Sequence, residues 1–148
     1  MMAEETKAPK ALDWVKARAE CSIDYLFIAL TAVVNADTEA AAARSGDYLQ
    51  FEVKRVTTDG FMVSRTFSDG GLFQSEVIAF ERKHDHVLVE KRTRDGSTKL
   101  FIATPHVDIQ GECKFEVNGA PMEPWQVSKK ALETFFFERG LAPKPKTK

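Results

Sequence analysis

The sequence is poor in the residues and motifs that usually reveal a protein's chemistry. It has two cysteines, eight glycines and six prolines among 148 residues. Glycine and proline at this level exclude a collagen-like or low-complexity chain. Cys21 and Cys113 form no CxxC pair, so there is no spacing for a metal cluster or a thioredoxin-like redox motif. Because cysteine is among the most buried residue types, we expect two buried free thiols.

An excess of charge of one sign is also missing. The 21 basic and 22 acidic residues give a formal net charge of −1, which creates no global field to attract nucleic acid or an anionic membrane. Residues 1–10 lack the basic flank and apolar core of a secretory signal. The longest apolar run, residues 23–34, is interrupted by Asp24 and Thr31 and is shorter than the ~20 residues that span a bilayer. We therefore expect a cytoplasmic protein without a membrane span or a nucleic-acid partner.

The chain lacks the short catalytic and nucleotide-binding motifs that can be recognised from spacing. We find no GxSxG, HExxH, GxxxxGK[ST] or GxGxxG. The sequence therefore favours a protein without catalytic activity, and we assign no catalytic residue and no cofactor.

Hydrophobic periodicity, in contrast, is clear near the N-terminus. Between residues 11 and 34 the larger apolar residues recur at steps of three and four, which is typical of one stripe of an amphipathic helix. Asn35 or Asp37 can cap a second helix that ends before Gly46. The N-terminal segment is therefore either one bent helix or two.

After Gly46 the apolar period changes to two, which is typical of strands with one buried face. Turn signals that contain glycine separate these runs at residues 59–60, 69–71 and 95–96. No crossover helix lies between them, so the sequence predicts an antiparallel meander. The six predicted strands are residues 49–54, 61–67, 72–83, 87–93, 98–107 and 113–117.

A C-terminal helix follows the predicted strands. It begins near Pro124 or Ser128 and ends at Gly140. Beyond it, residues 141–148 alternate proline and lysine and are expected to be a disordered basic tail. These elements predict a single α+β domain over residues 11–140, in which a curved six-stranded sheet wraps the N-terminal helical segment, with a flexible segment at 1–10. The residues that this helix should bury are Ala131, Leu132, Phe135 and Phe136.

Three histidines and one aspartate are weak candidates for a metal site. His84, His86, His106 and Asp108 fall at one corner of the predicted sheet. A two-residue loop at residues 95–96 places His86 and His106 on opposite faces, whereas a three-residue loop with a bulge gathers all three histidines. The register with the bulge therefore allows a metal site, whereas the register with the two-residue loop does not.

The two-residue loop is the favoured register. It pairs Val89 with Ile102 and collects Glu90, Arg92 and Lys99 on the other face, as a sheet with one buried face requires. We therefore predict solvated turn histidines and no bound metal.

Three consecutive phenylalanines, residues 135–137, lie in the predicted C-terminal helix. Their rings sweep about 200° around a helix, which is wider than the face that a surface helix usually buries. We expect Phe137 to be exposed and to form, with Trp125, Phe136 and Leu141, a surface for a protein partner or a second copy. The sequence thus favours a non-catalytic binding or assembly protein that self-associates through this helix or an exposed sheet edge.

The alternative is a small-molecule-binding or small enzyme domain that uses a pocket between helix and sheet. Phenylalanine rings from the strands would line such a pocket and favour a small apolar ligand. Glu20 and Asp24 share one helix face, and a carboxylate that projects into the pocket can act as a general base. The candidate polar residues for this pocket are Glu20, Asp24, Tyr25, Tyr48 and Glu76.

Overall fold

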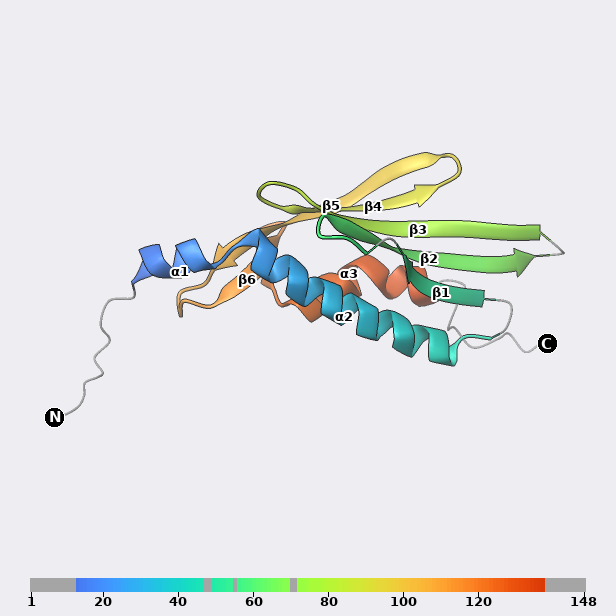
Figure 1. Ribbon diagram of the computed structural model, residues 1–148, viewed down its shortest axis with the longest axis horizontal. Coiled ribbons are helices and arrows are strands. Elements are labelled where there is room, and N and C mark those ends of the chain that lie inside the picture. Colours follow the sequence, from blue (N-terminus) through green and yellow to red (C-terminus); the bar gives the residue numbers. More distant parts are fainter. Residues whose placement is uncertain (1–12, 47–48, 55, 70–71, 138–148) are drawn as a thin grey trace.

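Figure 1 shows a sheet with helices on one of its faces. The computed structural model describes residues 13–46, 49–54, 56–69 and 72–137. Two helices, α1 (Trp14–Glu20) and α2 (Ile23–Arg44), precede the sheet, and α3 (Pro124–Phe137) follows it. The predicted α+β fold is confirmed. The segments expected to be flexible or disordered, 1–10 and 141–148, lie outside the described residues.

Within the residues that the structure describes, seven antiparallel strands form one sheet and follow one another in sequence order, as a meander requires. The sequence predicted six of these strands and missed the last. This strand follows a tight turn at Asn118 and Gly119, whose φ angles of 53° and 84° are those of a primed hairpin turn. The strands are β1 (Leu49–Lys54), β2 (Gly60–Asp69), β3 (Leu72–Arg82), β4 (Val87–Thr93), β5 (Gly96–Val107), β6 (Cys113–Val117) and β7 (Ala120–Met122).

The hairpin between β4 and β5 differs from the favoured register. Its ladder closes with Thr93 opposite Gly96, and a bulge then leaves Leu100 unpaired between two ladder positions. Val89 therefore lies opposite Phe101, and the predicted pairing of Val89 with Ile102 is wrong. The physical reason is that the turn falls at Arg94 and Asp95, one position earlier than expected, and the bulge then adds one residue to β5. Together these put Phe101 and not Ile102 on the core face.

The N-terminal segment consists of two helices, but they do not separate where the sequence suggested. The break lies at Cys21 and Ser22, and Ser22 caps α2 by accepting a hydrogen bond from the backbone N–H of Tyr25 at 3.1 Å. The two predicted caps, Asn35 and Asp37, lie inside α2. The helix continues through them because its buried stripe continues through Val34, Thr38 and Ala41.

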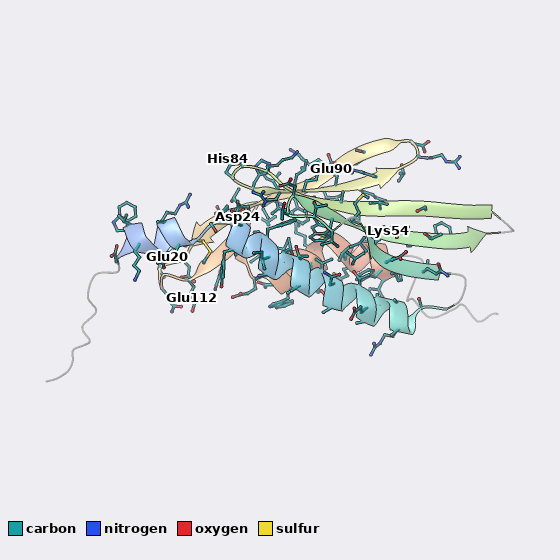
Figure 2. All side chains as sticks on the ribbon, in the orientation of Figure 1. Glu20, Asp24, Lys54, His84, Glu90 and Glu112 are labelled. Carbon is teal, nitrogen blue, oxygen red and sulfur yellow. A yellow bond between two sulfur atoms is a disulfide. The ribbon has the colours of Figure 1, made fainter. Side chains whose placement is uncertain are left out.

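The core lies between the sheet and the two longer helices, α2 and α3, which cover the same face (Figure 1). Phenylalanine rings from different elements pack against one another there, and Figure 2 shows how densely side chains fill this layer. The Phe61 ring stacks on Phe80 with centroids 4.7 Å apart, and Phe51 meets Phe136 at 5.0 Å. Three of the rings expected to line a pocket, Phe51, Phe61 and Phe80, thus contact neighbouring rings.

Helix α2 has an unusual composition for a helix at the surface. Within the described residues it is the one helix whose length and apolar content would allow it to cross a membrane. Core helices of soluble proteins meet the same criterion, and α2 buries Leu26, Phe27 and Leu30 against the sheet. The absence of a membrane span stays a prediction.

Candidate functional site

The candidate site is built on α3, whose start is fixed by local chemistry. Pro124 occupies the first helical position, where its missing N–H costs nothing. The backbone N–H of Glu123 donates to Oε1 of Gln126 at 2.8 Å, which is half of a capping box. Val127, Ala131 and Phe135 are buried against the core. Their burial fixes the rotation of α3 about its own axis, and this rotation sets which of its residues face solvent.

One row of α3 residues at a spacing of four faces solvent. We call this row the α3 ridge; its members are Trp125, Lys129, Glu133 and Phe137. Trp125 is 55% exposed and Phe137 is 51% exposed, although large aromatic side chains are usually buried. Between them, Nζ of Lys129 and Oε1 of Glu133 form an ion pair at 3.0 Å. The ridge therefore has apolar ends and a charged middle.

A groove of about 480 Å³ runs beside the ridge, between α2 and α3. We call it the α2–α3 groove. The hollow exists because Ala40 and Ala41 of α2, which line it, have small side chains. The two helices are joined across it by Oγ of Ser128, which donates to Oδ2 of Asp37 at 2.7 Å. Other lining residues are Arg44, Leu132 and Phe136, together with the four residues of the α3 ridge.

The structure brings together three of the four residues predicted for a partner surface. Trp125, Phe136 and Phe137 all line the α2–α3 groove. Phe136 is itself 7% exposed and contributes to the floor, while the other two rings stand at the rim. Leu141 lies outside the described residues. An apolar floor with aromatic and charged rims is the arrangement that receives an amphipathic helix.

Residues proposed for a small-molecule pocket are not gathered in one place. Glu20 and Tyr25 are exposed, and Tyr48 lies outside the described residues. Glu76 forms an ion pair with the buried Arg65, so its carboxylate already has a cationic partner. Among the described residues of this set, Asp24 alone lines a hollow of the size that small ligands occupy.

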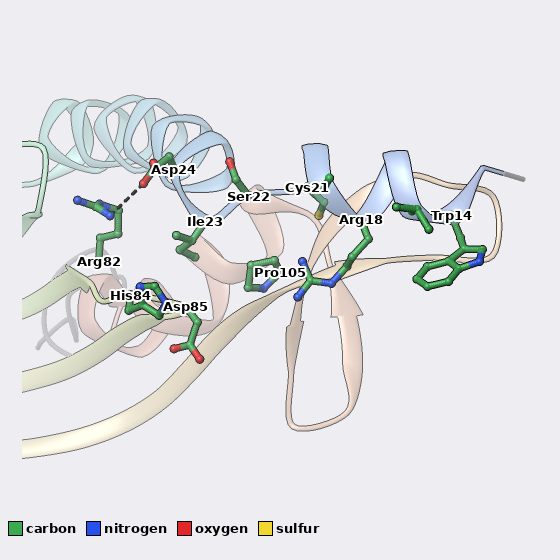
Figure 3. A pocket seen from close by; sticks show the side chains of 12 residues that line it. Trp14, Arg18, Cys21, Ser22, Ile23, Asp24, Arg82, His84, Asp85 and Pro105 are labelled. Atoms are coloured by element: carbon green, nitrogen blue, oxygen red, sulfur yellow. Dashed lines mark ion pairs between the residues drawn. The ribbon is translucent and has the colours of Figure 1, made fainter.

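Asp24 lines two open grooves, of about 680 and 780 Å³, and Arg82 lines both as well. Figure 3 shows the first of them, with Asp24 beside Arg82. Nη1 of Arg82 meets Oδ1 of Asp24 at 2.9 Å, and Nη2 meets Oδ1 of Asp59 at 2.7 Å. Nε of Arg82 donates to the Thr58 carbonyl at 3.1 Å. Because all three nitrogens are engaged, Arg82 clamps the β1–β2 loop to α2 rather than offering a free cation.

The three histidines considered for a metal site lie in different surroundings. Nδ1 of His86 lies 2.8 Å from Oδ1 of Asp85, and this hydrogen bond lowers the pKa of the Asp85 carboxyl. His84 lines the groove beside Asp24, and His106 lies opposite Lys114 in the β5–β6 ladder. In the part of the chain that the structure describes, no three such ligands come together.

Asp108, the fourth metal candidate, organises the turn between β5 and β6. Its Oδ1 accepts from the backbone N–H groups of Glu112 and Gln110, both at 2.9 Å. The hydrogen bond from Glu112 and then the one from Gln110 lower the pKa of Asp108. Nζ of Lys114 lies 3.4 Å from its other oxygen. Asp108 therefore stabilises a turn.

The two cysteines are joined as a disulfide, so the expectation of two free thiols is wrong. The fold brings the end of α1 to the start of β6, with the Cα atoms of Cys21 and Cys113 5.1 Å apart, within disulfide range. Nothing in the spacing of two cysteines reveals such a contact. Disulfides persist in oxidising compartments and are rare in the cytosol; the cytoplasmic localisation stays a prediction.

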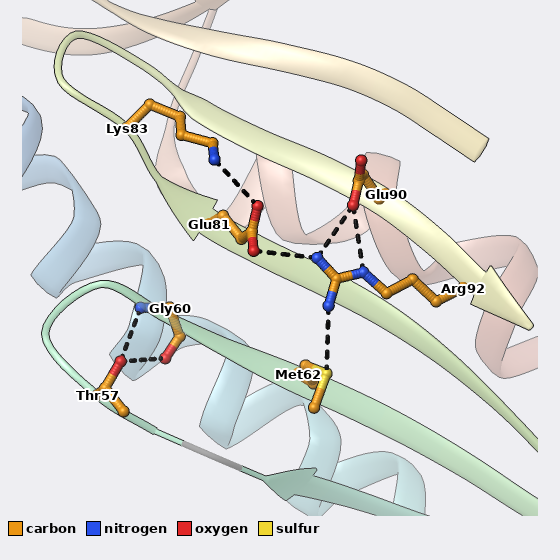
Figure 4. Close-up of polar contacts among 7 residues, drawn as sticks. All are labelled: Thr57, Gly60, Met62, Glu81, Lys83, Glu90 and Arg92. Carbon is orange, nitrogen blue, oxygen red and sulfur yellow. Dashed lines mark hydrogen bonds and ion pairs between the residues drawn. The ribbon is translucent and has the colours of Figure 1, made fainter. Parts of the chain in front are cut away.

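The face of the sheet opposite the helices carries a polar network (Figure 4). The sequence placed Glu90 and Arg92 on this face but did not reveal Glu81 as their partner. Arg92 bridges Glu81 and Glu90, with Nη2 3.0 Å from an oxygen of each. The hydrogen bond from Arg92 lowers the pKa of the Glu81 carboxyl. Nη1 of Arg92 also contacts Sδ of Met62 at 3.9 Å. These side chains satisfy one another, so the network is better suited to bracing strands than to binding a ligand.

Comparison with known proteins identifies no relative of this chain. No protein-family model, curated protein or solved structure matches the chain. The geometry of the α2–α3 groove and the α3 ridge is therefore the basis for a functional assignment.

Proposed function

We propose that this protein is a non-catalytic assembly protein that self-associates through the α3 ridge and the α2–α3 groove. The observation that carries the proposal is the pair of half-exposed aromatic rings, Trp125 and Phe137, at the two ends of one solvent-facing row. Aromatic residues at the rim of an apolar hollow are typical of protein interfaces, where they supply much of the binding free energy.

The dimensions favour a protein partner over a small ligand. Residues 125 and 137 are separated by about 18 Å along the helix at 1.5 Å per residue, which is the length of a helical segment. The groove beside them has an alanine floor at Ala40 and Ala41, onto which another helix can pack closely. A second copy of the chain supplies such a helix at equal concentration and is the occupant that we propose.

The test is the molar mass in solution, measured by size-exclusion chromatography with light scattering over a range of protein concentrations. The wild-type protein is expected to move toward the mass of a dimer as its concentration rises. Phe137→Asp should shift the protein to the monomer, because it places a carboxylate where an apolar ring is buried in the dimer.

Thr134→Asp provides the matched control. Thr134 is an exposed residue about one helical turn before Phe137, but it lines a different hollow, beside Lys130 and Phe101. The substitution Thr134→Asp introduces the same charge near the same end of α3 and should leave the dimer intact. A wild-type protein that stays monomeric at every concentration would refute the proposed function.

A further inference from the structure

The order of residues along the α3 ridge is self-complementary. The ridge runs from an aromatic residue through a cation and an anion to a second aromatic residue: Trp125, Lys129, Glu133, Phe137. Lys129 and Glu133 lie two residues on either side of Ala131, and the aromatic residues lie six on either side. The same four residues are therefore compatible with a two-fold axis that crosses the ridge midway along it, at the level of the buried Ala131.

From this order, and resting on the proposed function, we infer that the second copy docks with its α3 antiparallel to the first. A two-fold axis perpendicular to α3, midway between Lys129 and Glu133, places Lys129 of each copy opposite Glu133 of the other. The same operation places Trp125 opposite Phe137 at both ends. One symmetric contact thus makes two intermolecular ion pairs and two aromatic contacts, as expected of an isologous interface.

The parallel arrangement is disfavoured by charge. It would bring the two Lys129 side chains together and the two Glu133 side chains together, and like charges juxtaposed across an interface cost several kcal/mol. Antiparallel docking converts both repulsive contacts into attractive ones. The charges of the ridge therefore select the orientation of the two copies, while the aromatic rings supply apolar contact.

The shape of the surface is compatible with this orientation. Rows at a spacing of four form the ridges by which helices commonly pack into the grooves of a facing helix. The α2–α3 groove lies directly beside the α3 ridge and shares Trp125 and Phe137 with it. Each copy can therefore offer its ridge to the other copy's groove.

The existing ion pair within α3 does not compete with the intermolecular pairs. Lys129 and Glu133 have side chains that are 59% and 58% exposed, so both retain room for a second partner. In the antiparallel dimer the four charges alternate in sign and form one network. A network of several charges contributes more to the binding free energy than an isolated surface ion pair does.

A charge exchange tests the orientation directly. Lys129→Glu and Glu133→Lys should each raise the dimer dissociation constant by about tenfold or more, because each variant faces like charges twice across the two-fold axis. An equimolar mixture of the two variants should recover the dimer mass in light scattering, because every contact is again between opposite charges. The double variant Lys129→Glu/Glu133→Lys should also dimerise as wild type does.

Lys99→Glu is the matched control for the change in net charge. Lys99 is an exposed residue of β5, and this variant should dimerise normally and should not rescue Glu133→Lys. Circular dichroism checks that every variant is folded, which we expect because the exchanged side chains are exposed. If Phe137→Asp dissociates the dimer but the mixture of charge variants stays monomeric, the antiparallel orientation is wrong while the assembly function stands. If single charge variants dimerise as wild type does, the orientation is also wrong. A monomeric wild-type protein refutes both.

Discussion

At the scale of single residues, the most informative side chain is a buried arginine. Arg65 of β2 is 2% exposed and lies in the core face of the sheet, opposite Phe51 of β1 and Glu76 of β3. Its Nη1 donates to the Phe135 carbonyl at 2.7 Å, and its Nη2 pairs with the Glu76 carboxylate. The last carbonyls of a helix lack partners within the helix, so Arg65 caps α3 from the sheet side. It thereby positions the end of α3 that presents Phe137.

We predict that Arg65→Met destabilises the protein by about 3 kcal/mol, because it leaves the Glu76 carboxylate and a helix-terminal carbonyl without their partner. The double variant Arg65→Met/Glu76→Gln should be more stable than the single variant, since it also removes the unpaired charge. Urea unfolding followed by circular dichroism measures both. A loss below 1 kcal/mol for Arg65→Met would contradict the capping role.

At the scale of elements, α1 depends on a covalent connection. None of its residues is buried, and Trp14 at its start is 68% exposed. Its C-terminal end leads directly into Cys21, which is bonded to Cys113 at the start of β6. An isolated helix of 7 residues is too short to be stable in water. The disulfide therefore holds the α1–α2 junction against the β5–β6 part of the sheet.

We predict that Cys21→Ser/Cys113→Ser lowers the free energy of unfolding by about 4 kcal/mol, because the disulfide closes a loop across a sequence separation of 92 residues. The wild-type protein should lose a similar amount when a dithiol reductant is added during urea unfolding. The serine variant is the control, and the reductant should leave its midpoint unchanged. An equal effect of the reductant on both proteins would contradict the prediction.

At the scale of the whole molecule, the helices shield one face of the sheet and leave the other to its own side chains (Figure 1). On that second face the Arg92 network lies over β2, β3 and β4. On the helical side the α2–α3 groove and the α3 ridge present half-exposed aromatic rings. The apolar surface proposed for assembly thus belongs to helices that also cover the core.

We predict that thermal stability depends on protein concentration, because association of the folded state shifts the unfolding equilibrium by mass action. At a protein concentration one hundred times the dissociation constant, association raises the free energy of unfolding by at most about 2.7 kcal/mol. The unfolding midpoint of the wild-type protein should therefore fall as the protein is diluted, whereas that of Phe137→Asp should stay constant. Differential scanning calorimetry at several concentrations checks both, and a constant wild-type midpoint would argue against self-association.

Local patterns in the sequence predicted the elements and much of the core. The alternation of apolar residues located the strands, and helical spacing identified Ala131, Leu132, Phe135 and Phe136 as buried. The rotation of 100° per residue explains why Phe137 is exposed beside two buried rings. Two further signals were present but unused. Asn118-Gly119 is a hairpin turn signal, and Arg65 falls in phase with the buried residues of β2.

Contacts between distant segments could not be predicted in this way. The bulge at Leu100 changes which residues of β5 face the core, because it puts Phe101 opposite Val89. The Cys21–Cys113 bond joins segments that only the complete meander brings together. Similarly, Asp37 and Ser128 meet only because α2 and α3 share one face of the sheet.

The sequence by itself determined the periodicity of each element, the antiparallel order of the strands and the exposed position of Phe137, because these depend on neighbours within a few residues. Tertiary structure decided where the N-terminal helices separate, that the cysteines pair, and that Arg65 caps α3. It also decided that Ala40 and Ala41 of α2 lie beside the α3 ridge. These features depend on packing between segments far apart in the chain, and local propensity carries no information about that packing.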